Sequence, residues 1–135
     1  MPAPTETVGI RLQLSPVYRI VRGLPKGTVV VEFPFGVVGD EIRYTYAAGY
    51  HRQPIVNGYS GFFPAPYRRL LLSLSDPTAS DEAWPLLVAS GATHAVVHEA
   101  GFPNQTKGSR VSVWLRLHGA REIATVDTHH IFALR

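Results

Sequence analysis

The chain has 135 residues, 45% of them hydrophobic and 17% charged, which predicts one globular domain (residues 1–135) and excludes a disordered chain. The absence of cysteine excludes a disulfide framework, a thiolate zinc site and a cysteine nucleophile. Thirteen Lys and Arg residues against ten Asp and Glu residues give a net charge of +3. The basic residues are scattered along the chain, so we expect no nucleic-acid partner.

The first part of the chain predicts an extended segment, a short helix and a buried strand. Residues 1–14 are expected to be extended, because apolar and polar residues alternate from residue 8 to 14. Ser15 is placed to cap a helix that has Pro16 at its first position and ends at a left-handed Gly23. The β-branched run TVVVEFPF (28–35) is typical of a strand buried on both faces, as in a parallel sheet.

The middle of the chain is predicted to hold a long aromatic loop, two helices and a second strand. Residues 36–66 are rich in Gly, Pro and aromatic residues and predict a loop, with a short extended or helical piece around IRYTYAAGY. Helices are expected over 64–74 and 80–92, with Pro85 disturbing the first turn of the second. THAVVHE (93–99) predicts a strand parallel to the first.

The last part of the chain is ambiguous at one point. Residues 110–120 fit both a strand and one face of a helix, and we favour the helix because Gly119 is a natural stop. The remaining residues predict a hairpin that turns near Asp127 and Thr128. The fold class is therefore α/β: a small mixed sheet with two central parallel strands, a C-terminal antiparallel hairpin and helices packed on both faces.

Candidate ligand contacts gather where the first central strand ends. Ligands of open α/β sheets bind at the carboxyl ends of the strands, and long loops are commonly functional or packed on themselves. The predicted ligand-binding residues are Glu32, Asp40, Arg43, Tyr44, His51, Asn57, Tyr59 and Ser60. The alternative is structural: the aromatic residues cover the sheet edge, and Asn57 with Gly58 makes a turn.

The sequence assigns no metal site, no cofactor and no catalytic residue. His94 and His98 would share a strand face but stand too far apart to chelate, while His129 and His130 would point to opposite faces. Ser60 does not lie in the Gly-x-Ser-x-Gly pattern of a nucleophile elbow. One enzymatic alternative stays open: a small hydrolase or transferase that uses Glu32, Asp40 and His51 at the strand's carboxyl end.

Four motifs occur in an order that resembles a known family. They are VVEFPFG (30–36), RYTY (43–46), HRQPIVNGYSGFFP (51–64) and GATHAVVH (91–98). Together they resemble the C-terminal extracytoplasmic part of bacterial polytopic membrane proteins of the glycosyltransferase-family-39-like, or GT-C, type, which use lipid-phosphate sugars. The similarity extends from about Leu14 to Leu134.

The resemblance implies a binding role rather than a catalytic one. In such proteins the catalytic carboxylate lies in a loop near the first membrane helices, and this chain has no such segment. It implies a non-catalytic accessory or ligand-binding domain on the extracytoplasmic face, which contacts a glycan or lipid-linked sugar beside a membrane-embedded partner.

The sequence itself has no apolar run long enough to span a membrane and no secretory signal, and it predicts a soluble chain. A weaker alternative is an interaction module whose exposed Phe62 and Phe63 meet a partner or a bilayer.

Overall fold

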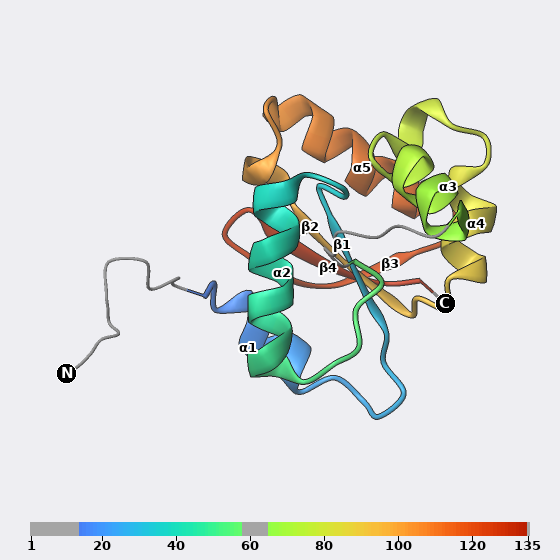
Figure 1. The fold of residues 1–135 in the computed structure, drawn as a ribbon. Helices are drawn as coiled ribbons and strands as arrows, with labels where there is room; N and C mark the ends of the chain where they lie inside the picture. Colours follow the sequence, from blue (N-terminus) through green and yellow to red (C-terminus); the bar gives the residue numbers. More distant parts are fainter. Residues whose placement is uncertain (1–13, 58–64, 135) are drawn as a thin grey trace.

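The computed structural model describes residues 14–57 and 65–134, and it confirms the predicted α/β class (Figure 1). The helices and strands are α1 (Val17–Arg22), β1 (Val30–Phe33), α2 (Val38–His51), α3 (Ala65–Leu74), η2 (Pro77–Ala79), α4 (Ala83–Ala89), β2 (His94–His98), η3 (Glu99–Gly101), α5 (Gln105–Leu117), β3 (Arg121–Val126) and β4 (His129–Ala133), where η marks a 3-10 helix. None of the helices in the described part of the chain has both the length and the apolar character needed to cross a membrane. The predicted extended segment over residues 1–14 lies outside the described residues, apart from Leu14.

The four strands form one mixed sheet in the order β1-β2-β4-β3. β1 and β2 are parallel, and β3 and β4 form the predicted hairpin, which turns at Asp127 (φ 53°) and Thr128. β4 pairs antiparallel with β2, so β1 is the outer strand of the sheet. Residues 54–57 cover its outer edge, and their backbone forms hydrogen bonds with both the amide and the carbonyl of Val30. This cover explains why an outer strand has the continuous apolar sequence of an inner one.

Helices cover both faces of the sheet (Figure 1). α3, α4 and α5 pack over Val31, Phe33, Ala95, Val97 and Phe132. On the opposite face, α1 and α2 pack over Val30, Val96 and Ile131. Successive residues of a strand point to opposite faces, so Glu32, His98 and His129 share the α1–α2 face with these three residues.

The helix α2 corrects the predicted loop over residues 36–66. Fourteen residues of that segment are helical, far more than the short piece expected around IRYTYAAGY. The buried stripe of α2 consists of Glu41, Tyr44, Ala47 and His51, at a spacing of three to four residues. Glu41 and His51 in this stripe are strongly polar, so the helical period is not visible as an apolar pattern.

The remaining helices follow the predictions, with local differences. α5 is the helix that we favoured over 110–120, but it begins earlier, at Gln105, and its N-cap is Asn104, whose side chain accepts a hydrogen bond from the Thr106 amide at 2.8 Å. At α1, Pro16 is the N-cap rather than the first helical residue that we predicted, and the Ser15 hydroxyl accepts a hydrogen bond from the Val17 amide at 3.2 Å. The predicted left-handed stop at Gly23 is wrong, because its φ is −86°.

Candidate functional site

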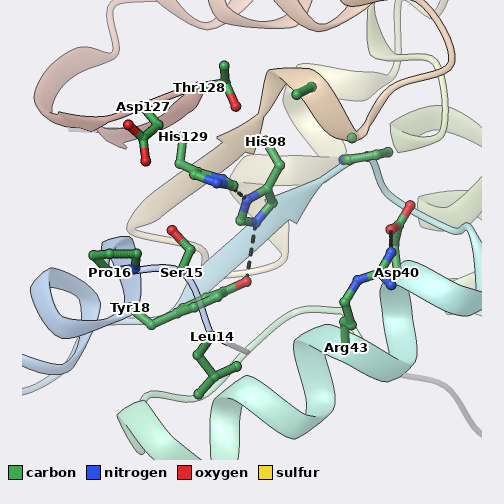
Figure 2. A pocket seen from close by; sticks show the side chains of 13 residues that line it. Leu14, Ser15, Pro16, Tyr18, Asp40, Arg43, His98, Asp127, Thr128 and His129 are labelled. Carbon is green, nitrogen blue, oxygen red and sulfur yellow. Dashed lines mark hydrogen bonds and ion pairs between the residues drawn. The ribbon is translucent and has the colours of Figure 1, made fainter. Parts of the chain in front are cut away.

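A cavity of about 500 Å³ opens on the α1–α2 face, where β1 and β2 end. Its walls come from the start of α1, the first turn of α2, the segments that follow β1 and β2, and the β3–β4 turn (Figure 2). The residues that line it are Leu14, Ser15, Pro16, Tyr18, Pro34, Asp40, Arg43, His98, Ala100, Gly101, Asp127, Thr128 and His129. The predicted location at the carboxyl end of the parallel strands therefore coincides with this cavity.

A buried carboxylate lies behind the cavity. Glu32 is completely inaccessible to solvent, because it follows Val30 on the face that α1 and α2 cover. Its Oε1 accepts a hydrogen bond from the Tyr18 hydroxyl at 2.5 Å and lies 2.8 Å from Nε2 of His98. Its Oε2 has no hydrogen-bond partner among the described residues. A buried carboxylate needs such donors to offset the loss of water, and here both donors come from residues that line the cavity.

Two histidines connect Glu32 with the cavity. His98 and His129 are directly opposite each other in the β2–β4 pairing, and their Nδ1 atoms are 2.7 Å apart (Figure 2). The hydrogen-bond network assigns the neutral tautomers. His98 donates Nε2–H to Glu32, so its Nδ1 is an acceptor and His129 must donate Nδ1–H to it. The Nε2 of neutral His129 is then unprotonated and able to accept a hydrogen bond from a ligand.

Two tyrosines hold the His98 imidazole in place. The Tyr44 ring stacks on His98 with a centroid distance of 5.5 Å and an angle of 16°, and its hydroxyl donates to the Pro34 carbonyl at 2.8 Å. The Tyr18 ring lies 5.9 Å from His98 on another side. Burial, and then the nearby Glu32 carboxylate, raises the pKa of both tyrosines above the usual value. Both hydroxyls therefore remain donors throughout the physiological pH range.

The first turn of α2 supplies the charged part of the wall. Arg43 donates to Asp40 at 2.7 Å, an (i, i+3) pair on the helix surface. Both residues line the cavity, together with Asp127 from the hairpin turn. With neutral histidines, the lining thus contains one cation and two carboxylates.

The structure separates the predicted ligand-binding residues into two groups. Asp40 and Arg43 line the cavity. Glu32, Tyr44, His51 and Asn57 are buried and do not line it, in contrast to the single polar wall that we expected. They belong instead to the layer that supports the cavity. The predicted residues Tyr59 and Ser60 lie outside the described residues.

His51 and Asn57 have clear positions within this supporting layer. His51 stacks on Tyr18 with a centroid distance of 5.7 Å, and its Nδ1 accepts from the Gln53 amide at 3.0 Å. Burial lowers the pKa of His51, although the Glu32 carboxylate opposes this effect. Asn57 pairs with the main chain of Glu32: its Oδ1 accepts from the Glu32 amide at 2.7 Å, and its Nδ2 donates to the Glu32 carbonyl at 2.9 Å.

Sequence reasoning missed Tyr18, His98 and His129 as site residues. Tyr18 belongs to a helix that we interpreted only as a packing element, and the two histidines were considered only as metal ligands. One signal was available: an acidic residue inside the β-branched run TVVVEF has to find donors when it is buried. No signal gave the β2–β4 register that brings His98 and His129 together.

The site contains no metal-binding cluster within the described ranges, where no group of three or more His, Asp or Glu residues is arranged to hold an ion. Comparisons with known proteins give no direction either. No family model matches the chain, and no curated protein or solved structure matches it. The resemblance to the extracytoplasmic part of GT-C-like glycosyltransferases stays a prediction.

Proposed function

We propose that this chain is a non-catalytic, ligand-binding domain whose cavity holds a sugar unit of a glycan or of a lipid-linked sugar. The observation that supports this proposal is the lining of the cavity. Apolar surface from Leu14, Pro16 and Pro34 stands beside converging donors and acceptors from Arg43, Asp40 and the histidine pair. Binding sites for small molecules combine apolar walls with a few fixed polar groups, and a sugar ring presents both kinds of surface.

The charges favour an uncharged ligand at neutral pH. Asp40 neutralises Arg43 through their ion pair, and Asp127 adds a further carboxylate to the lining. An anionic ligand would meet this excess of negative charge. Sugar hydroxyl groups can instead donate to the carboxylates and to the free Nε2 of His129, and accept from Arg43.

The arrangement supports binding more than turnover. Of the three residues in the hydrolase or transferase alternative, only Asp40 lines the cavity. Glu32 is completely buried, and His51 is 1% exposed on the far side of the Tyr18 ring. A general acid or base must come within hydrogen-bond distance of the reacting group, and neither residue is accessible to a ligand in the cavity.

The family resemblance adds a cellular context to the proposal. We place the domain at the extracytoplasmic face of a membrane, beside a membrane-embedded glycosyltransferase partner whose sugar or acceptor glycan enters the cavity. The four motifs that carry the resemblance include residues in or near the cavity: Glu32, Pro34, Arg43, Tyr44, Asn57 and His98.

A titration with methyl glycosides of common hexoses and pentoses, followed by NMR at pH 7.5, tests the proposal. We expect millimolar binding, with shifts at Ser15, Arg43, Gly101 and His129. The substitution Arg43→Gln should weaken binding several-fold. Shifts that are absent, or scattered over the surface, would refute the proposal.

The chain offers a matched control for Arg43→Gln. Arg69 is also an exposed arginine in a surface ion pair, with Glu82 at 2.6 Å, but it does not line the cavity. Each substitution removes a surface ion pair worth at most about 1 kcal/mol of stability. Arg69→Gln should therefore leave glycoside binding unchanged, and equal losses in both variants would contradict a direct role for Arg43.

A further inference from the structure

The histidine pair at the rear of the cavity has a defined capacity for protons. In the neutral pair, the Nδ1–H of His129 donates to Nδ1 of His98, and the Nε2–H of His98 donates to Glu32. One additional proton fits on Nε2 of His129 without breaking either hydrogen bond. A second proton would have to occupy Nδ1 of His98, and two N–H groups would then face each other across 2.7 Å. The intact pair therefore takes up one proton and no more.

This single proton reverses the hydrogen-bonding character of the cavity. Neutral His129 offers a ligand an acceptor, whereas the protonated ring offers a charged donor. The charge of the lining changes at the same time. One cation and two carboxylates become two cations and two carboxylates, so the excess of negative charge disappears.

We propose that the His98–His129 pair couples the cavity to pH, so that one proton taken up at His129 converts it into a binding site for the phosphodiester group of a lipid-phosphate sugar. A sugar joined to a lipid through one phosphate is a phosphodiester with one negative charge. This inference rests on the proposed function and names the part of the ligand that the histidine pair contacts.

The groups around the pair support one proton and oppose a second. Glu32 from β1 lies beneath His98, and its Oε1 attracts positive charge on the pair. Tyr18 from α1 and Tyr44 from α2 remain uncharged. Burial lowers the pKa of His51, also from α2, and so favours its neutral form, against the opposing effect of Glu32. Asp40, Arg43 and Asp127 complete the lining, and His130 is the next residue on β4.

The electrostatic balance at His129 sets the pH range. Burial, then the neighbouring His98 and also His130 lower the pKa of His129, whereas Asp127 and Glu32 act in the opposite direction. A lowered pKa means that His129 takes up its proton at a lower pH than an ordinary histidine, whose pKa is about 6.5. A bound anion stabilises the protonated form, so anion binding and proton uptake strengthen each other.

The tautomers can be tested without any substitution. Long-range ¹H–¹⁵N spectra of the histidine rings, recorded from pH 8 to pH 5, should show the Nε2–H form of His98 and the Nδ1–H form of His129 at high pH. On acidification, the protonation shift should appear first at Nε2 of His129. The opposite tautomers, or simultaneous protonation of both rings, would overturn the proposal.

Binding can be tested with dimethyl phosphate, which carries one negative charge throughout this pH range. Its affinity should increase several-fold from pH 7.5 to pH 5.5, with a limit of about tenfold per pH unit for one linked proton. Calorimetry in buffers of different ionisation enthalpy should show the uptake of up to one proton per bound ligand. His129→Gln should remove both effects. His94→Gln is the matched control, because His94 lies on β2 together with His98 and on the same face of the sheet, and burial lowers its pKa, but it does not line the cavity.

A parallel titration with methyl glycosides at pH 7.5 separates this inference from the proposed function. Glycoside binding together with pH-independent binding of dimethyl phosphate would overturn the inference alone. pH-dependent binding of dimethyl phosphate without any glycoside binding would support the inference and contradict the proposed sugar site. Absence of binding by both probes would refute both.

Discussion

The substitution Asn57→Ala should destabilise the fold more than any loss of a surface polar residue. Asn57 is 3% exposed and makes three hydrogen bonds to buried partners: the amide of Glu32 at 2.7 Å, its carbonyl at 2.9 Å and Oε2 of Glu41 at 2.9 Å. The Asn57 side chain thus makes the hydrogen bonds to the outer edge of β1 that a neighbouring strand would otherwise make. Alanine would leave the Glu32 amide and carbonyl without these partners in a place that water does not reach.

The size of the effect follows from these three bonds. A hydrogen bond contributes about 1 kcal/mol net, and a buried donor or acceptor left without a partner costs about 1–3 kcal/mol. We therefore expect Asn57→Ala to lower the free energy of unfolding by about 3–5 kcal/mol. Asn57→Asp should cost more at pH 7, because it keeps the acceptor but turns a carboxylate oxygen toward the Glu41 carboxylate. Part of this additional cost should disappear at pH 4, where aspartate begins to protonate.

Urea denaturation measures this effect, provided that the dependence on urea concentration is the same in all variants. Asn104→Ala is the reference, because Asn104 makes one exposed capping bond at α5 and should cost about 1 kcal/mol. If Asn57→Ala costs no more than Asn104→Ala, the reasoning is wrong, and the outer edge of β1 does not depend on this side chain.

Two further predictions concern stability away from the cavity. Gly108→Ala should destabilise the chain by about 1–3 kcal/mol, because a Cβ there would lie 2.7 Å from the Glu99 Cα. Gly49→Ala should instead stabilise the chain by up to about 1 kcal/mol, because Gly49 lies in α2 with open space around it. Thermal or urea unfolding of both variants tests the contrast. At Glu122, hydrogen bonds, first that from His130, lower the pKa to about 2 against the opposing effect of burial. Because the pKa is lower in the folded state, ionised Glu122 contributes stability above the unfolded value near 4.5, and this contribution is lost as the pH falls toward 2. The difference in unfolding free energy between wild type and Glu122→Gln should therefore shrink over that range. A constant difference would contradict the lowered pKa of Glu122.

The sheet could be predicted because its strands carry local signals. The β-branched run before Pro34 and the apolar run around Val96 indicate buried strands wherever they occur. The segment between Arg121 and Ala133 carries its own turn, so the hairpin does not depend on distant residues. The helix α5 was the ambiguous case, and its Gly119, which has a φ of 94°, marked the correct end.

The helix α2 could not be predicted from its apolar pattern. Its inner face includes Glu41, which accepts hydrogen bonds from the Gly36 amide and from Asn57, and His51, which packs on Tyr18. Its outer face includes Ile42 and Tyr46, which are about half exposed. Polar residues inside and apolar residues outside reverse the usual amphipathic pattern. Contacts with distant residues hold these two side chains, that of Glu41 with Asn57 and that of His51 with Tyr18, although Nε2 of His51 has no hydrogen-bond partner among the described residues.

The cavity depends even more strongly on distant pairing. The location at the end of the parallel strands follows from a general rule of α/β sheets, and Asp40 and Arg43, which we predicted on this basis, line the cavity there; their contact with a ligand stays a prediction. The contact between His98 and His129, which are 31 residues apart in the sequence, requires the exact register of β2 and β4. A shift of one residue would turn one ring to the α5 face. No local pattern contains this information.

The position of Glu32 is the strongest physical reason to regard the histidine pair as functional. A carboxylate in the middle of a β-branched strand conflicts with every local rule of core design, and a buried charge is costly even when it receives hydrogen bonds. A valine at this position would pack against Val96 in the same layer without that cost. What the carboxylate adds is orientation: it fixes the tautomer of His98, and through it the tautomer of His129. Such conflicts between local preference and fold are concentrated at functional sites, and this one is connected by two hydrogen bonds to the lining of the cavity.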